Sequence, residues 1–181
     1  MDWIKLAREI GFEDACMLNM DALKPMREVR EMCSADRCKV YGKRWSCPPA
    51  CGSIEHCKSR IKRYNSGVLV QTTGALEDDF DLAGIEASHK IHNHRFATMA
   101  RQALSITCDS LALSAGACTR CDVCTYPKSL CRYPGKALSS MEAFGLLVSQ
   151  VCSESGMAYF RGEKTISFTS CILFNIKEND T

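Results

Sequence analysis

The spacing of apolar residues predicts alternating helices and strands along the first part of the chain. Residues 3–10 place apolar side chains at helical intervals, and residues 15–20 predict a short buried strand. Pro25 begins a charged helix. Ser53 is a suitable N-cap for a further, basic helix that runs toward Tyr64. A cysteine-rich loop therefore separates two short helices.

The same alternation continues through the middle of the chain. Residues 67–73 are rich in β-branched side chains and predict a strand. An acidic connection then leads into a long helix, expected over residues 85–105. A second apolar run at residues 111–115 brings the chain into another cysteine-rich loop.

The end of the chain predicts one more helix and two more strands. Ser139 or Ser140 is expected to cap a helix toward Cys152. The closing stretch, MAYFRGEKTISFTSCILFN, predicts two strands joined in a hairpin at residues 161–163. We therefore expect a single α+β domain over residues 1–181, with a mixed β-sheet covered by helices and two cysteine-rich cluster-binding loops.

Composition places the chain among globular proteins. Its 181 residues are 46% hydrophobic and 24% charged, which excludes the disordered and fibrous classes. No apolar stretch reaches the roughly 18 residues of a membrane span, and the first residues lack a signal-peptide apolar block. We expect a cytoplasmic protein that does not bind membranes.

Charge narrows the expected partners. The net charge of +2 gives no general attraction for nucleic acid. Basic residues outnumber acidic ones over residues 24–63, which forms either a solvated face or a docking surface for an acidic redox partner protein. The oligomeric state stays open.

Thirteen cysteines are the outstanding feature of the composition. Their number is odd and no export signal precedes them, so a disulfide scaffold is a poor explanation, and metal or redox use is a better one. Nine of the thirteen fall into two tight groups. Cys16, Cys108, Cys152 and Cys171 stand alone in apolar surroundings, and Cys171 is expected to be a small core residue.

The later group forms the motif C-x2-C-x2-C with Cys118, Cys121 and Cys124, followed by Cys131. Three thiolates at this spacing wrap a short loop around one face of a cubane cluster, and a more distant cysteine completes four ligands. Zinc also takes four thiolates, but it usually uses paired C-x2-C knuckles, and the return pair is missing here. We favour a [4Fe–4S] cluster over zinc and over thiol–disulfide chemistry.

The earlier group holds Cys33, Cys38, Cys47, Cys51 and Cys57 in a loop rich in glycine and proline. Such a loop folds around something other than its own apolar side chains, and a second [4Fe–4S] cluster would fill it. Four ligands suffice for one cluster. Cys33, Cys38 and Cys47 are expected ligands, and Cys57 is preferred over Cys51 as the fourth.

Three neighbours of this group allow two interpretations each. Trp45 either shields a cluster from water or is an ordinary core residue. Lys43 and Arg44 either offset the negative charge of thiolates and cluster or form a solvated basic pair.

The two cysteine motifs, together with the stretches CRYPGKALSSMEAFGL and TSCILF, resemble a family catalogued as predicted metal-binding proteins, domain of unknown function 2284. The resemblance covers residues 33–49, 115–126, 131–148 and 165–174. It implies metal binding, chiefly in anaerobes, and it implies no reaction.

Other polar residues give weaker signals. His89, His92 and His94 lie on the predicted long helix, where a solvent-facing surface is a better explanation than a metal site. Glu142 is explained by stabilisation of a helix N-terminus. No Gly-x-Gly-x-x-Gly fingerprint supports a flavin or a nicotinamide.

The functional hypothesis is an iron–sulfur protein with two [4Fe–4S] clusters that transfers electrons or reductively activates a partner enzyme. One alternative is an enzyme that binds substrate at an open iron of a cluster, and another is a zinc-binding interaction module. The sequence does not decide whether the protein is an enzyme.

Overall fold

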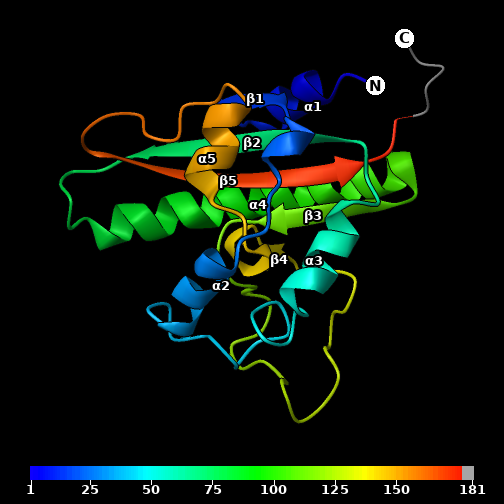
Figure 1. The fold of residues 1–181 in the computed structure, drawn as a ribbon. Coiled ribbons are helices and arrows are strands. Elements are labelled where there is room, and N and C mark those ends of the chain that lie inside the picture. The colour runs from blue at the N-terminus through cyan, green and yellow to red at the C-terminus, as the bar shows by residue number, and fades with distance from the viewer. Residues whose placement is uncertain (177–181) are drawn as a thin grey trace.

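The computed structural model describes residues 1–176 of the chain. Within them, five α-helices, two short 3₁₀ turns (η1 and η2) and five strands alternate (Figure 1). In chain order they are α1 (Trp3–Ile10), β1 (Asp14–Met17), η1 (Met20–Ala22), α2 (Arg27–Ser34), α3 (Ile54–Ile61), β2 (Ser66–Ala75), α4 (Leu82–Thr107), β3 (Ser110–Ser114), β4 (Ser139–Ser140), η2 (Glu142–Phe144), α5 (Val148–Glu154) and β5 (Thr165–Phe174).

The five strands form one mixed sheet in the order β1-β2-β5-β3-β4. β2 and β5 pair antiparallel over ten residues each, from Ser66 opposite Phe174 to Ala75 opposite Thr165. β1 and β3 extend the sheet antiparallel on either side, and only β4 joins its neighbour in parallel. The predicted α+β class with a mixed sheet is confirmed.

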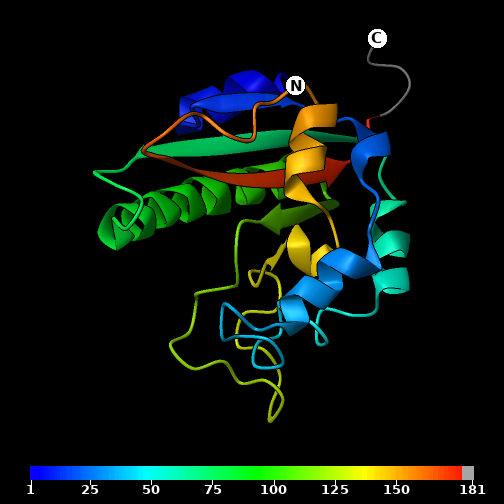
Figure 2. The same ribbon diagram turned by 60° about the vertical axis from the view of Figure 1, so that its left-hand side comes forward.

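The sheet separates two apolar cores because successive side chains of a strand point to opposite faces. Val68 and Val70 of β2 face α1 and α4, where Trp3 stacks on Phe174 at a centroid distance of 4.2 Å. Leu69 faces the other side, in a core that includes residues of α5 and η2. Figure 2 shows α5 and α4 on opposite sides of the sheet.

Side-chain caps fix the beginnings of three helices. The Asp2 carboxylate accepts a hydrogen bond from the Lys5 backbone N–H, and Asp81 does the same for Gly84. At α3, Ser53 Oγ accepts from the His56 backbone N–H, so the predicted N-cap is confirmed. This cap sets the position of the helix that carries Cys57.

The predicted hairpin at residues 161–163 is wrong. β5 is a single strand, and residues 157–164 precede it as irregular chain. Both edges of β5 are occupied, one by β2 and the other by β3, so no edge remains for a strand formed by the preceding residues. Long-range pairing here overrides the local pattern.

The predicted helix from Ser139 or Ser140 to Cys152 is also wrong in its first part. Ser139 and Ser140 form β4, and α5 begins only at Val148. Between them, Ser140 Oγ accepts from the Ala143 backbone N–H and starts η2. Gly145, at a φ of +80°, then ends this turn in the left-handed region and redirects the chain.

Both cysteine groups leave the sheet at the same end. The first cysteine segment (residues 33–57) and the second cysteine segment (residues 118–131) lie below the sheet in both Figure 1 and Figure 2. No helix within residues 1–176 has the length and apolar character to cross a membrane.

Candidate metal centres

The four cysteines of the second cysteine segment line one small cavity. Cys118, Cys121, Cys124 and Cys131 contribute to its wall, and all thirteen cysteines of the chain are free. β3 brings the chain into this segment and β4 takes it back to the sheet. The close C-x2-C-x2-C spacing places three of these cysteines in the wall that Cys131 completes.

The first cysteine segment supplies another wall of this cavity. Arg44 Nη1 donates to the carbonyl oxygens of Cys118 at 2.7 Å and Cys121 at 3.4 Å. Ser46 Oγ accepts from the Cys118 backbone N–H at 3.2 Å. These bonds join residues far apart in the sequence, so the two segments hold each other in place.

Trp45 lies at the second cysteine cavity and is only half-buried. Its indole Nε1 donates to the Ser129 carbonyl at 3.1 Å, and its ring packs edge-on against Tyr126 at 4.9 Å. The indole therefore covers the cysteines of the second segment. This position favours the shielding interpretation. Trp45 belongs to the first cysteine segment in sequence, but the cysteines that it covers belong to the second.

The five thiols of the first cysteine segment form a continuous row of neighbours. The charges of Cys38 and Cys47 act on Cys33, and those of Cys47 and Cys57 act on Cys51. α2 carries Cys33 near its C-terminal end, and α3 carries Cys57. The two helices therefore position Cys33 and Cys57 at the ends of the row, and the loop between the helices supplies the cysteines in its middle.

Turn η2 contacts this row from the sheet side. The Cys33 Sγ lies 3.9 Å from the Glu142 carbonyl oxygen, and the Cys51 Sγ lies 3.6 Å from that of Ala143. The Met26 backbone N–H donates to the Gly145 carbonyl at 2.8 Å and joins the start of α2 to the end of η2. The row is therefore anchored to the rigid sheet.

Arg30 is a residue of this site that sequence reasoning missed. Its Nη1 lies 3.6 Å from the Cys57 Sγ, and its Nη2 donates to the Gly52 carbonyl at 2.8 Å. The hydrogen bond from Cys51, together with the Arg30 guanidinium, lowers the pKa of Cys57 to about 7. The available sequence signal was the spacing of Arg30 and Cys33. Residues three apart share one face of a helix, so this spacing places Arg30 on the face of α2 that carries the cysteine.

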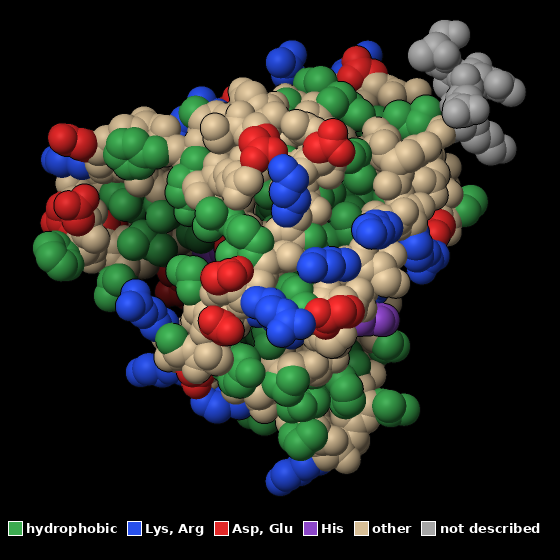
Figure 3. All heavy atoms as spheres, viewed as in Figure 1, with side chains coloured by type: hydrophobic (Ala, Val, Ile, Leu, Met, Phe, Trp, Pro, Cys, Tyr) green, Lys and Arg blue, Asp and Glu red, His purple; other side chains and the backbone are tan. Residues whose placement is uncertain are grey.

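Cys47 and Cys118 are neighbours across the two segments, close enough for the charge of one to act on the other. Figure 3 shows hydrophobic side chains over the lower part of the molecule, where both segments lie in Figure 1. The two cysteine groups therefore form one region and not two distant sites.

The potential metal ligands of this region are cysteine thiols. Within residues 1–176, no three Cys, His, Asp or Glu side chains converge closely enough to hold a single metal ion. The four cysteines of the second segment nevertheless line one cavity. Thiolates favour zinc and iron–sulfur groups. Metal ligation by the nine grouped cysteines stays a prediction.

The expectation for the histidines is wrong at His92. This side chain is fully buried, and its Nε2 lies 2.7 Å from Ser170 Oγ on β5. Burial lowers the pKa of His92 to about 3 and keeps the imidazole neutral. α4 packs along the sheet with this face inward, whereas His94 is exposed. His89 is half-buried beside the Ala115 carbonyl.

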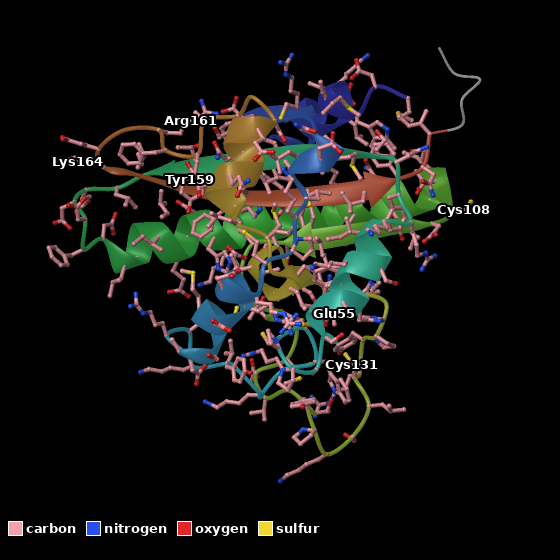
Figure 4. The ribbon with its side chains drawn as sticks, viewed as in Figure 1. Glu55, Cys108, Cys131, Tyr159, Arg161 and Lys164 are labelled. Carbon is pink, nitrogen blue, oxygen red and sulfur yellow. The ribbon has the colours of Figure 1, made fainter. Side chains whose placement is uncertain are left out.

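The isolated cysteines differ in their surroundings. Cys171 and Cys152 are fully buried, and the prediction that Cys171 is a core residue is confirmed. Cys108 is exposed at the C-cap of α4, so its predicted apolar surroundings are wrong. Figure 4 shows Cys108 far from Cys131.

The fold and the grouped thiols define a cysteine-rich α+β protein suited to binding metal. The sequence model of the family described as predicted metal-binding protein (DUF2284) matches residues 16–174. The chain belongs to this family, which confirms the resemblance seen in its motifs. Comparisons with curated proteins and with solved structures gave no match.

Proposed function

We propose that this protein holds two [4Fe–4S] clusters and transfers single electrons to a partner protein. The observation that carries the proposal is the cavity lined by all four cysteines of the second cysteine segment. Four thiols around one cavity are the ligand set of a cubane cluster. When bound, such a cluster accepts and donates one electron at a time.

The second cluster would be held by Cys118, Cys121, Cys124 and Cys131. Cys33, Cys38 and Cys47 would hold the first cluster with one more thiolate. Cys51 neighbours Cys47, whereas Cys57 is engaged by Arg30. Because the nearby guanidinium favours the thiolate form that ligates metal, this arrangement supports Cys57, the fourth ligand that the sequence favoured.

The position of the two groups supports an electron path. Cys47 and Cys118 lie within electrostatic reach of each other, so an electron would pass between neighbouring groups. At the surface, the side chains of Val123 and Leu130, neighbours of Cys124 and Cys131, are 77% and 86% exposed. A partner that contacts these side chains would come close to the second group.

The chemistry of the surface suggests the kind of partner. The stretch from Arg120 to Lys136 is predominantly basic, with Asp122 as its one carboxylate. An acidic redox protein fits this charge, since complementary charge speeds association and orients the partners. The proposed electron enters from a donor protein and leaves to this partner.

Iron and acid-labile sulfide analysis after anaerobic reconstitution tests the proposal. Two clusters predict about eight irons and eight sulfides per chain and a brown protein. Cys108→Ser is a matched control because Cys108 is exposed and isolated, and it should leave both counts unchanged. Fewer than about four irons per chain would remove the two-cluster proposal. A colourless protein with stoichiometric zinc would replace it with the zinc module.

A further inference from the structure

A separate cavity of about 260 Å³ opens between α4, β3 and residues 134–139. Small side chains on α4 and in the following loop leave this space, among them Ala97, Ala100 and Ala137. β4 is only two residues long, so it covers little of the β3 edge that forms the cavity floor. Its volume lies near the lower end of ligand pockets, which begin at roughly 300 Å³.

Four cationic side chains from different parts of the chain line this cavity. They are Arg60 of α3, Arg101 of α4, Arg120 of the second cysteine segment and Lys136 just after it. No Asp or Glu lines the cavity, and none of the four pairs with a carboxylate within residues 1–176. Uncompensated like charges around one cavity favour an anion.

Neighbouring groups orient three of these cations. The Arg60 guanidinium lies 5.1 Å from the centre of the Phe144 ring. Arg120 Nε donates to the Lys136 carbonyl at 2.8 Å, and Arg101 Nη2 donates to Thr98 Oγ1 at 3.2 Å. Each guanidinium keeps further N–H groups for a ligand, and their prior orientation lowers the entropic cost of binding.

Most of the rest of the lining is apolar, with Ser110 and Ser139 as the polar exceptions. Leu104, Leu111 and Leu113 join the alanines in the wall and floor. A ligand that satisfies the whole cavity therefore has an anionic head and an apolar body. Arg120 and Ala137 also line the cavity of the second cysteine segment, so such a ligand would lie one layer of residues from those thiols.

We propose that this cavity, the cationic cavity, binds a small organic anion with an apolar body, either a carboxylate or a phosphate monoester. The inference goes beyond the proposed electron transfer and does not depend on it, because the cationic cavity is formed without any cysteine. If both proposals hold, the anion lies beside the second cluster.

Calorimetric titration with four probes tests the class of ligand. Benzoate and phenyl phosphate supply the two anionic heads on the same apolar ring, benzyl alcohol is the neutral analogue, and inorganic phosphate lacks the apolar body. At least one aromatic anion should bind about tenfold or more tightly than both benzyl alcohol and inorganic phosphate, and added salt should weaken its binding. The tighter of the two identifies the head group.

Variants locate the binding. Arg101→Ala and Lys136→Ala each change an exposed side chain and should weaken the bound anion about tenfold, the loss of one charge-assisted contact. Lys62→Ala removes an exposed cation that does not line the cavity and should leave affinity unchanged. Ala100→Phe should block binding by filling the space.

Equal binding of benzyl alcohol, no binding of either aromatic anion to folded protein, or equal losses in Lys62→Ala and Arg101→Ala would overturn the proposal. Iron is measured on the same samples. If protein that takes up no iron binds the anion, this proposal stands and the cluster proposal fails. If protein loaded with iron binds neither aromatic anion, the cluster proposal stands and this one fails.

Discussion

Two arginines of the first half of the chain are placed against the cysteine groups. Arg30 contacts the Cys57 thiol, and Arg44 contacts the carbonyls of Cys118 and Cys121. A cluster with four thiolate ligands is negatively charged, and a nearby fixed cation reduces the cost of holding it away from water. Both guanidinium groups are half-buried, which strengthens this effect.

Replacing Arg44 by Ala should weaken the second centre while the sheet stays folded. The change removes two hydrogen bonds from a charged donor, each of which contributes on the order of 1.5–3 kcal/mol. We expect iron content to fall toward half and residual colour to bleach faster in air. Lys43→Ala is the matched control, since Lys43 is exposed and pairs with Asp36. Equal iron content in both variants would contradict the assigned role of Arg44.

Cys51→Ser and Cys57→Ser distinguish the fourth ligand of the first centre. If Cys57 is the ligand, its replacement should lower iron content by about half, whereas Cys51→Ser should retain most of the iron. The opposite result would identify Cys51 as the fourth ligand instead. Iron analysis of both variants, reconstituted side by side, decides between them.

His92 should make folding sensitive to acid. Its pKa is about 3 in the folded protein against 6.5 for an exposed histidine, so the unfolded chain binds the extra proton between these values. Stability is therefore complete above pH 6.5 and falls as the pH drops toward 3, by on the order of 4 kcal/mol. His92→Gln should flatten this part of the urea-unfolding profile. If the variant keeps the wild-type slope of unfolding free energy against pH, His92 is not the group responsible.

At the scale of elements, η2 and Gly145 connect the sheet to the first cysteine segment. A Cβ on Gly145 would lie 2.8 Å from the Met26 carbonyl oxygen and 2.5 Å from Ile54 Cδ1. Met26 precedes α2 and Ile54 begins α3. The bare backbone of Gly145 thus allows the two cysteine-bearing helices to pack close to the sheet.

Gly145→Ala and Gly156→Ala form a matched pair that measures this contact. Both glycines have a positive φ, +80° and +76°, but a Cβ on Gly156 would meet nothing within 4 Å. Gly156→Ala should cost only the left-handed strain, about 1 kcal/mol, and Gly145→Ala should cost at least about 2 kcal/mol more because backbone must move. Urea unfolding gives both values. Similar losses would show that the approach of α2 and α3 is not tight.

Elements with strong local patterns could be predicted from the sequence. The Ser53 cap and the amphipathic helix α1 depend on neighbours within one or two turns. The hairpin failed because the pairing of β5 with β2 and β3 joins residues far apart in the chain. His92 was misplaced because α4 carries inward-facing polar groups that bond to β5, which a simple polarity pattern does not reveal.

At the scale of the whole molecule, the sheet and the cysteine region have different sources of order. Two apolar cores hold the sheet. By contrast, no residue from 116 to 139 is buried. Burial of apolar surface therefore contributes little to the order of the second cysteine segment, and a bound metal group would supply what the core does not.

The candidate site could be predicted in part for the same reason. Ligand spacing within one loop is local, so the sequence indicated that Cys118, Cys121, Cys124 and Cys131 belong together, and all four line one cavity. The contact of the two segments through Arg44, Ser46 and Trp45 depends on the fold. The sequence could not predict it, because those residues and their partners lie more than 70 positions apart.

Cys121→Ser tests whether the two groups are independent centres. Separate clusters predict that the variant loses about half of the brown absorbance and half of the iron, because the first cysteine segment keeps its own thiols. Complete bleaching would instead indicate one shared or mutually dependent centre, which the bonds of Arg44 and Ser46 to the second segment would then explain. Cys16→Ser replaces a cysteine outside both segments, so the absorbance of this variant gives the value expected when no ligand is lost. Because the two cores of the sheet contain neither Cys121 nor any of its neighbours, far-ultraviolet circular dichroism should stay the same in either case.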